Sequence, residues 1–246
     1  MNGTQALGRA LDILFVLAEA GTTLTVSEIA ERVAIPESSA YRFIQTLEQH
    51  GIVERKGKGR ITLGLRIFDL ARSLSGQIDR QLLIMARPVM EELTRRTDET
   101  SVLFIRSGLD AICIEHVKSR KLISVSLENG RVLPLDSGAS GKVLLAYESE
   151  VLIGQAVAQK SPDRAKALRQ ELERIRHQGY SYTNGEFDPD AFAVGAPILD
   201  KQQRIVASLS VAGPNYRFHE SHLPALAEET RTAAADISRQ LGWPGI

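Results

Sequence analysis

The first part of the chain carries hydrophobic residues at intervals of three and four positions, a pattern typical of short amphipathic helices. One such stretch covers residues 7–18, and Gly21 follows it as a stop signal. A second stretch begins in TVSEIAERVAI, where Thr25 is followed three residues later by Glu28. That spacing is typical of a capping box, in which each side chain accepts a hydrogen bond from the backbone N–H of the other residue. The sequence therefore predicts two short helices in succession.

A third helix is predicted in IPESSAYRFIQTLEQHG, residues 35–51. Ala40, Phe43 and Ile44 fall on its apolar face, and the opposite face carries Ser, Arg and Gln rather than the Glu and Lys usual on a solvated helix. Two short β-prone runs then flank the glycine-rich residues 56–59, which indicates a hairpin. Two helices, a turn, a third helix and a hairpin in this order form a winged helix-turn-helix.

The polar face of the third helix suits the major groove of DNA, where residues near a helix N-terminus reach the base edges. Arg42 can pair with guanine through two hydrogen bonds, and the basic hairpin can neutralise phosphates. The candidate DNA-binding residues are Ser38, Ser39, Tyr41, Arg42, Gln45, Arg55, Lys56, Lys58 and Arg60. The alternatives are a solvated helix on a small bundle and, for the hairpin taken alone, a solubilising turn.

The remainder of the chain mixes helical and β-prone segments. A helix is predicted over residues 65–74, and SLSGQ, residues 73–77, marks a boundary because small and polar residues gather there. Beyond it we predict helices over residues 78–96, 141–147, 149–158, 162–177 and 220–241, and strands in ETSVLFIRSG, AICIEHVKS and KLISVSL and over residues 180–187, 192–199 and 204–211. Runs of strands, then helices, then strands indicate an α+β fold with a mostly antiparallel sheet.

This organisation predicts three parts in the chain of 246 residues. They are a winged helix-turn-helix domain over residues 1–64, a linker helix over residues 65–76, and an α+β domain over residues 77–246. The formal net charge is zero, from 30 basic and 30 acidic residues, so any positive surface for nucleic acid must be local. Cys113 is the chain's one cysteine, which excludes an intramolecular disulfide and fits a reducing cytosol. No apolar run reaches the length of a bilayer span, so we expect a cytoplasmic protein that does not contact membranes.

Several sequence blocks carry a resemblance to a known family. The first is LGRALDILFVLAEAGTTLTVSEIAERVAIPESSAYRFIQTLEQHGIVERKGKGRITLGLRIFDLA, and LPLDSGASGKVLLA, GYSYTNGEF, AVGAPILD and ASLSVAGPNYR follow it. Together they resemble the IclR-type transcriptional regulators over nearly the whole chain. The resemblance implies a bacterial one-component regulator, more often a repressor than an activator. It also implies that the N-terminal domain binds a roughly palindromic double-stranded operator as part of a homodimer, often within a tetramer.

The resemblance further implies that the C-terminal part is a GAF/PAS-like antiparallel-sheet domain that binds a small organic or aromatic acid. Carried over by position, the effector-binding residues are Leu122, Val125, Leu133, Ala139, Ser140, Thr183, Ala193 and Ser210. Read for their own chemistry, the residues of SGASGK open a helix whose free N–H groups, with the hydroxyls of Ser137 or Ser140, suit a carboxylate. The alternative is that these two serines only cap the helix.

Enzymatic motifs are incomplete. GASGKVL lacks the first glycine of a phosphate loop and the Ser or Thr after its lysine, and no G-x-S-x-G elbow surrounds Ser140. Glu115 with His116, and His219 with His222, do not form a metal-ligand set. We therefore predict no catalytic residues, no metal site and no cofactor. The alternatives are a small-molecule-binding or enzymatic α+β domain with a helical dimerisation module, and a winged helix that binds protein.

Overall fold

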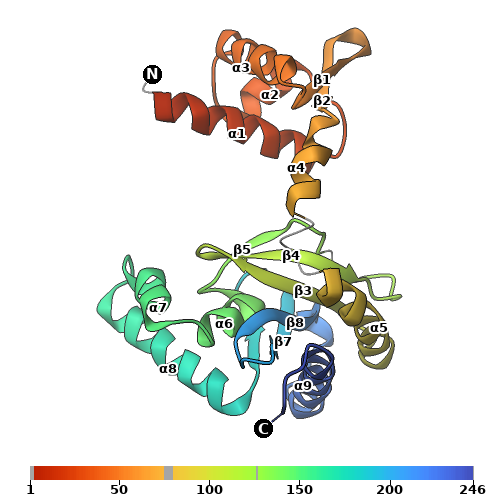
Figure 1. Ribbon diagram of the computed structural model, residues 1–246, viewed down its shortest axis with the longest axis vertical. Coiled ribbons are helices and arrows are strands. Elements are labelled where there is room, and N and C mark those ends of the chain that lie inside the picture. The colour runs from red at the N-terminus through yellow and green to blue at the C-terminus, as the bar shows by residue number, and fades with distance from the viewer. Residues whose placement is uncertain (1–2, 75–79, 126, 246) are drawn as a thin grey trace. The chain divides into compact units, whose positions relative to one another are not determined.

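The computed structural model describes residues 3–74, 80–125 and 127–245. The chain divides into two compact units, Met1–Asp79 and Arg80–Ile246. Each unit has its own hydrophobic core, and Figure 1 shows the helices and strands of each unit.

The first unit contains three helices followed by a two-stranded hairpin and a further helix. Its elements are α1 (Gly3–Ala20), α2 (Val26–Val33), α3 (Glu37–Gln49), β1 (Val53–Lys56), η1 (Gly57–Gly59), β2 (Arg60–Leu63) and α4 (Arg66–Leu74). The predicted capping box of α2 is confirmed, because the Thr25 N–H donates to Glu28 Oε2 at 2.7 Å and the Glu28 N–H donates to the Thr25 hydroxyl at 3.2 Å. Ala34 ends α2 in the left-handed conformation, with φ of 53°. The order of helices and hairpin is the one expected of a winged helix-turn-helix.

The core of this unit fixes how the helices present their outer faces. Its fully buried members include Ile13 of α1, Ile29 of α2 and Ile44 of α3, and the hairpin adds Ile61. The N–H and C=O groups of Ile61 also pair with Leu24, which joins the hairpin to the segment between α1 and α2. Burial of one face of α3 leaves its polar face towards solvent.

The second unit is a six-stranded antiparallel sheet with helices on both faces, in the strand order β5-β4-β3-β8-β7-β6 (Figure 1). Its strands are β3 (Thr100–Ser107), β4 (Asp110–Val117), β5 (Val132–Pro134), β6 (Ser181–Asn184), β7 (Ala191–Leu199) and β8 (Ile205–Pro214). Its helices are α5 (Arg80–Thr97), α6 (Gly138–Ala146), α7 (Glu150–Val157), α8 (Pro162–Gln178) and α9 (Leu223–Gln240), with short turns η2 (Asn215–Arg217) and η3 (Glu220–His222). The α+β class predicted from the sequence is confirmed.

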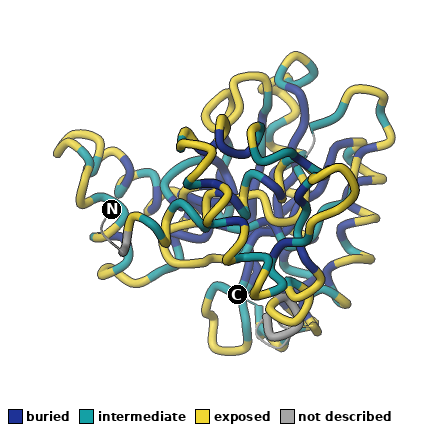
Figure 2. Tube along the Cα trace, turned by 90° about the horizontal axis from the view of Figure 1, so that it is seen from above, coloured by how far each residue is buried: buried dark blue, intermediate teal, exposed yellow. Residues whose placement is uncertain are grey.

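Two apolar layers hold the helices against the sheet. On one face, α6 and α8 cover β3 and β4 around Phe104, Leu144 and Leu172. On the other, α5 and α9 cover β7 and β8 around Met90 and Leu209. Figure 2 shows how buried and exposed segments alternate along the chain. At about 25 cal/mol per Å², such burial is the main force that stabilises the unit.

Glycines allow α6 to lie unusually close to the sheet. A Cβ atom on Gly141 would stand 2.5 Å from the carbonyl oxygen of Pro134 in β5, and one on Gly195 in β7 would stand 3.3 Å from the carbonyl group of Ala139 in α6. Every residue of α6 is buried as a result. The N-terminus of α6 is therefore held directly above β7 and β8.

One predicted strand is wrong. The described residues of KLISVSL form no strand, and β5 lies further along the chain, where it pairs with Asp110–Ile112 of β4. Carbonyl groups of this segment are used by side chains instead of a β-ladder. The guanidinium of Arg217 donates to the Ile123 carbonyl at 2.7 Å, and the Thr100 hydroxyl donates to the Val125 carbonyl at 3.3 Å. Alternating apolar residues had suggested a strand, but tertiary hydrogen bonds fix a loop.

Candidate functional site

The outer face of α3 presents polar side chains that are free to bind a partner. Ser38, Tyr41, Arg42 and Gln45 are exposed, and Ser39 is half-buried at the start of the helix. Among the residues that the structure describes, none forms an ion pair or hydrogen bond with the Arg42 guanidinium or the Gln45 amide. The outer face of α3 thus offers a free guanidinium and a free amide, the groups that read guanine and adenine edges.

Two of the basic side chains of the hairpin are paired with carboxylates, although the sequence had suggested unpaired charges. Lys56 Nζ lies 2.7 Å from Glu54 Oε2, and Arg55 lies 3.5 Å from Glu48 Oε2 while its guanidinium stands 5.7 Å from the ring of Tyr41. The hydrogen bond from Lys56 is the main reason that the pKa of Glu54 is lowered. The sequence pattern had shown no acid between the basic residues, but β1 and α3 bring two acids beside them.

The two remaining basic residues of the hairpin have different surroundings. Arg60 donates from Nε to the Thr23 hydroxyl at 2.7 Å, which fastens β2 to the segment after α1. Lys58 is exposed at the tip, in the left-handed conformation with φ of 60°, and pairs with no described residue. Lys58 is therefore the hairpin cation that is best placed to meet a phosphate.

A cavity of about 190 Å³ lies in the second unit between the N-terminus of α6 and the sheet. The structure brings seven of the eight residues expected at an effector site to its lining. They are Val125, Leu133, Ala139, Ser140, Thr183, Ala193 and Ser210. Leu122 is different, because it lies outside the lining with its side chain fully exposed. Its place in the non-strand loop before Val125 turns it towards solvent.

Buried hydroxyl groups form one end of this cavity. Ser140 Oγ and Ser210 Oγ lie 2.7 Å apart, and the Thr183 side chain from β6 is nearby in the lining. The first N–H groups of a helix have no partner within it, and no described residue accepts a hydrogen bond from the N–H groups of Ala139 or Ser140. Ser137 is the N-cap residue, but its side chain makes no capping hydrogen bond. This end can donate hydrogen bonds to a compact anion.

Apolar and charged residues that the sequence did not single out complete the lining. These are Val102, Phe104, Leu127, Arg131, Gly138, Phe187, Asp188, Ala191, Phe192 and Ala212. The guanidinium of Arg131 stands 5.5 Å from the centre of the Phe187 ring. No local pattern indicated this contact, since Arg131 precedes β5 and Phe187 follows β6. Aromatic walls beside hydroxyl groups favour a ligand with an apolar body and a polar end.

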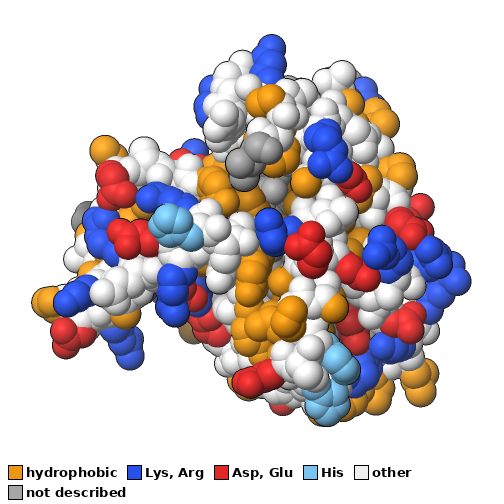
Figure 3. All heavy atoms as spheres, turned by 90° about the horizontal axis from the view of Figure 1, so that it is seen from below, with side chains coloured by type: hydrophobic (Ala, Val, Ile, Leu, Met, Phe, Trp, Pro, Cys, Tyr) orange, Lys and Arg blue, Asp and Glu red, His pale blue; other side chains and the backbone are white. Residues whose placement is uncertain are grey.

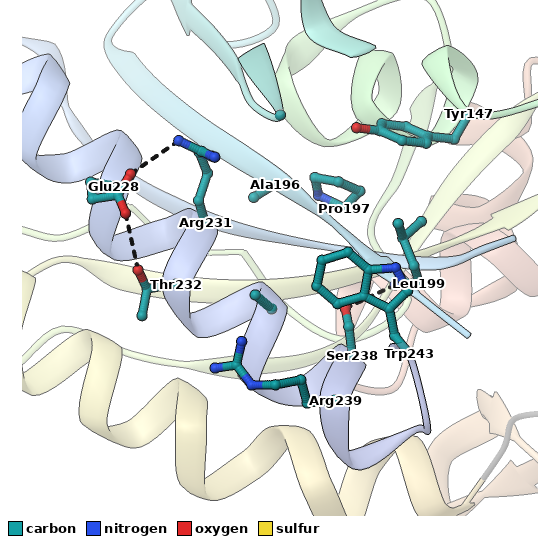
Figure 4. Close-up of a pocket in the computed structure, with 12 residues that line it drawn as sticks. Tyr147, Ala196, Pro197, Leu199, Glu228, Arg231, Thr232, Ser238, Arg239 and Trp243 are labelled. Atoms are coloured by element: carbon teal, nitrogen blue, oxygen red, sulfur yellow. Dashed lines mark hydrogen bonds and ion pairs between the residues drawn. The ribbon is translucent and has the colours of Figure 1, made fainter. Parts of the chain in front are cut away.

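A second hollow of about 200 Å³ lies between α9 and the end of β7. Figure 4 shows Tyr147, Pro197 and Trp243 around it, with Arg231 turned to Glu228 at 3.0 Å. Arg239 is likewise paired with Asp236. Because carboxylates already neutralise both arginines, this hollow offers less charge to a ligand than the cavity beneath α6.

Other features give no alternative site. On the face seen in Figure 3, basic and acidic side chains are interspersed, so this face has no broad positive surface. Within the described ranges, no group of three or more His, Cys, Asp or Glu side chains could hold a metal ion, and no helix is long and apolar enough to cross a membrane. Burial raises the pKa of Cys113 to about 11, so its thiol is protonated at neutral pH and is a poor nucleophile.

Comparisons with known proteins match both parts of the chain to one family. Residues 6–57 match the IclR helix-turn-helix domain, and residues 78–239 match the bacterial transcriptional regulator IclR C-terminal domain. The chain is 31% identical over 229 residues to the HTH-type transcriptional regulator KipR of Bacillus subtilis (strain 168), covering 90% of this chain and 91% of KipR. It is 28% identical over 250 residues to the HTH-type transcriptional repressor AllR of Escherichia coli (strain K12), and the match covers 98% of this chain and 92% of AllR.

A solved structure extends the comparison to a bound ligand. An IclR homologue from Microbacterium hydrocarbonoxydans, complexed with 4-hydroxybenzoate, superposes with a TM-score of 0.77. It is 26% identical in sequence, and the match covers 96% of this chain and 99% of the homologue.

Proposed function

This chain belongs to the IclR family of bacterial transcriptional regulators, and we propose that a small organic acid in the cavity beneath α6 controls its binding to operator DNA. The observation that carries this proposal is the joining, in one cavity, of a hydroxyl-lined helix N-terminus with aromatic walls. A carboxylate would accept hydrogen bonds from the N–H groups of α6, and the apolar body would contact the walls.

The size of the cavity supports a compact ligand. A cavity of about 150 Å³ lined by apolar side chains is known to bind benzene. The volume of about 190 Å³ here is enough for a single aromatic ring with small substituents. A ring with a carboxylate and a hydroxyl is also the chemistry of the 4-hydroxybenzoate bound by the Microbacterium homologue. Small aromatic acids are therefore the first effector class to test.

DNA recognition is proposed for α3 and the hairpin tip. Arg42 and Gln45 would contact base edges in the major groove, and Lys58 would contact a phosphate. Ser38, Ser39 and Tyr41 would form hydrogen bonds with the DNA backbone or with bases near the N-terminus of α3. Arg55, Lys56 and Arg60 would contribute less, since each has a partner within the domain.

A homodimer would bind the two halves of a palindromic operator. Exposed apolar residues on α1 support this proposal, because Leu7, Leu11 and Phe15 recur every four positions on the face away from the core. Their exposed fractions are 63%, 46% and 65%. Such a stripe is costly in water and is usually covered by a partner. Assembly of such dimers into a tetramer is a further part of the proposal.

The name of one relative supports a proposal for the sign of regulation. AllR is named as a repressor, so we favour repression that the acid relieves or strengthens. KipR and AllR are named as transcriptional regulators, and we propose that this chain acts in the same way, in the cytoplasm and without catalysis.

The test combines a ligand screen with a DNA experiment. A thermal-shift screen of small organic and aromatic acids should give at least one compound that raises the melting temperature. Footprinting of the DNA upstream of the chain's own gene should show a protected region that changes with that compound. A protein that neither responds to any acid nor protects DNA would contradict the proposal.

A further inference from the structure

Lys142 is a buried lysine that the DNA-binding and ligand-binding roles leave unexplained. It lies in α6, and its side chain is only 6% exposed. Its ammonium nitrogen is 2.8 Å from Glu171 Oε1 on α8 and 2.6 Å from Glu186 Oε2 in the segment between β6 and β7. A charge removed from water must have partners, because an uncompensated buried ammonium is strongly unfavourable. The ammonium therefore ties α6 to α8 and to the segment that contains Glu186.

The segment of residues 185–190, which we call the cavity loop, covers part of the cavity. The Gly185 N–H donates to the Ala191 carbonyl at 2.9 Å, so the loop is closed at its base. Phe187 and Asp188, which directly follow Glu186, line the cavity. A Cβ atom on Gly138 would meet the Phe187 Cβ at 3.7 Å, which places Phe187 against the first residue of α6. The position of Glu186 thus bears directly on the position of Phe187.

The carboxylates of Glu171 and Glu186, which both pair with Lys142, differ in the backbone that they hold. Both accept charge-assisted hydrogen bonds, which are stronger than neutral ones. Glu171 lies in the middle of α8, whose backbone is held by its own helical hydrogen bonds. Glu186 lies in a loop, and among the described residues neither Glu186 nor Phe187 has a backbone hydrogen bond, although backbone bonds hold the loop at Gly185, Asp188 and Asp190. Loss of the Glu186 contact should therefore loosen the cavity loop, whereas loss of the Glu171 contact should not.

We infer that Lys142 is a positioning residue for the cavity: its ammonium holds Glu186 and thereby keeps Phe187 over the N-terminus of α6. The same helix supplies the N–H groups at the cavity end and the ammonium that fixes the loop. The inference depends on the proposed function only in assigning an effector to this cavity. The positioning itself is a property of the protein without ligand.

Hydrogen–deuterium exchange on the full-length protein without ligand tests the positioning. Glu186→Ala should raise the exchange rate of amides in residues 185–191 about tenfold or more, because the loop then opens more often. Glu171→Ala is the matched control, since it removes the other carboxylate from the same ammonium, and it should change those rates less than about twofold. Glu186→Gln keeps one hydrogen-bond acceptor and should give an intermediate rate. Equal effects of the two alanine variants on the loop, or no effect of Glu186→Ala, would overturn the inference.

Ligand binding provides the second readout, with 4-hydroxybenzoate as the probe. Its dissociation should be several-fold faster from Glu186→Ala than from Glu171→Ala, because Phe187 no longer stays over the cavity. Equal rates from both variants would contradict a role of the loop in holding the ligand. If the wild-type protein does not bind the probe, that failure falls on the proposed effector class. The exchange comparison then still decides whether Lys142 positions the loop.

Discussion

Arg42 is the residue of α3 that is best suited to read a base, because its guanidinium is exposed and has no partner among the described side chains. Arg42→Ala should weaken binding to the operator by about 1–3 kcal/mol and should affect random DNA much less. Fluorescence anisotropy with both DNA sequences checks this. Arg55→Ala is the control, since Arg55 is already paired with Glu48. If operator and random DNA lose equally, Arg42 contacts only phosphate.

Lys58 and Lys56 differ in a way that a salt titration can detect. Affinity for DNA falls as salt rises, and Lys58→Ala should make this slope of log affinity against log salt less steep by about one, because one phosphate contact is lost. Lys56→Ala should change the steepness of this slope less, since Glu54 already pairs with Lys56. The measurement is DNA affinity at several salt concentrations, and an unchanged slope in Lys58→Ala would remove the hairpin tip from the interface.

Ser210 forms its hydrogen bond with Ser140 inside the cavity. Ser210→Ala should reduce the free energy of unfolding by about 1–3 kcal/mol, because the Ser140 hydroxyl loses its buried partner. It should also weaken the binding of 4-hydroxybenzoate. Ser208→Ala is the matched control on the same strand, since the Ser208 hydroxyl is buried without a partner among the described groups. Urea unfolding of both variants gives the comparison, and equal losses would show that the hydroxyl pair is not special.

At the scale of elements, the closeness of α6 to the rest of its unit depends on glycine. Gly141→Ala should destabilise the second unit by about 1–3 kcal/mol, because its Cβ would stand 2.5 Å from the Pro134 carbonyl oxygen. Gly154→Ala in α7 is a matched helical control with nothing within 4 Å of its Cβ. There the higher helix propensity of alanine should stabilise by about 0.5–1 kcal/mol. Thermal unfolding measures both variants, and an equal fall in their melting temperatures would contradict this account of α6.

At the scale of the whole molecule, the apolar stripe on α1 should govern assembly. Leu11→Asp should shift the proposed homodimer towards monomer, because a carboxylate cannot be buried in an apolar interface without a partner. Val151→Asp is the control, since Val151 is an exposed apolar residue on α7 in the second unit. Analytical ultracentrifugation measures the change in mass. A Leu11→Asp protein that remains as associated as the wild type would exclude the α1 stripe as the interface.

The proposed control of DNA binding by an acid would also be a property of the whole molecule. The ligand can change operator affinity only as far as it binds two states of the protein with different affinities. By the same linkage, operator DNA must change the affinity for the acid by an equal factor. Both directions can be measured once a ligand is found.

Apart from the strand expected in KLISVSL and from β5, which was not predicted, the helices and strands of each unit could be predicted from the sequence because they depend on local chemistry. Helical periodicity, the Thr25–Glu28 capping box and the glycines near helix ends act over a few residues, and the structure agrees with them. The exposure of Arg42 followed from the same local pattern, since burial of one helix face leaves the other in solvent.

Contacts between distant segments were decided only by the tertiary structure. The segment KLISVSL has the alternation of a strand, yet its Val125 and Ile123 carbonyl groups accept hydrogen bonds from side chains of β3 and η2. Glu54 and Glu48 pair with hairpin cations that looked free in the sequence. Phe187 lies against Gly138, and Lys142 pairs with Glu186, although the partners in each contact are far apart along the chain. A local pattern fixes the periodicity of a segment, whereas a hydrogen bond or ion pair also needs a partner, and only the folded chain determines which partner lies within reach.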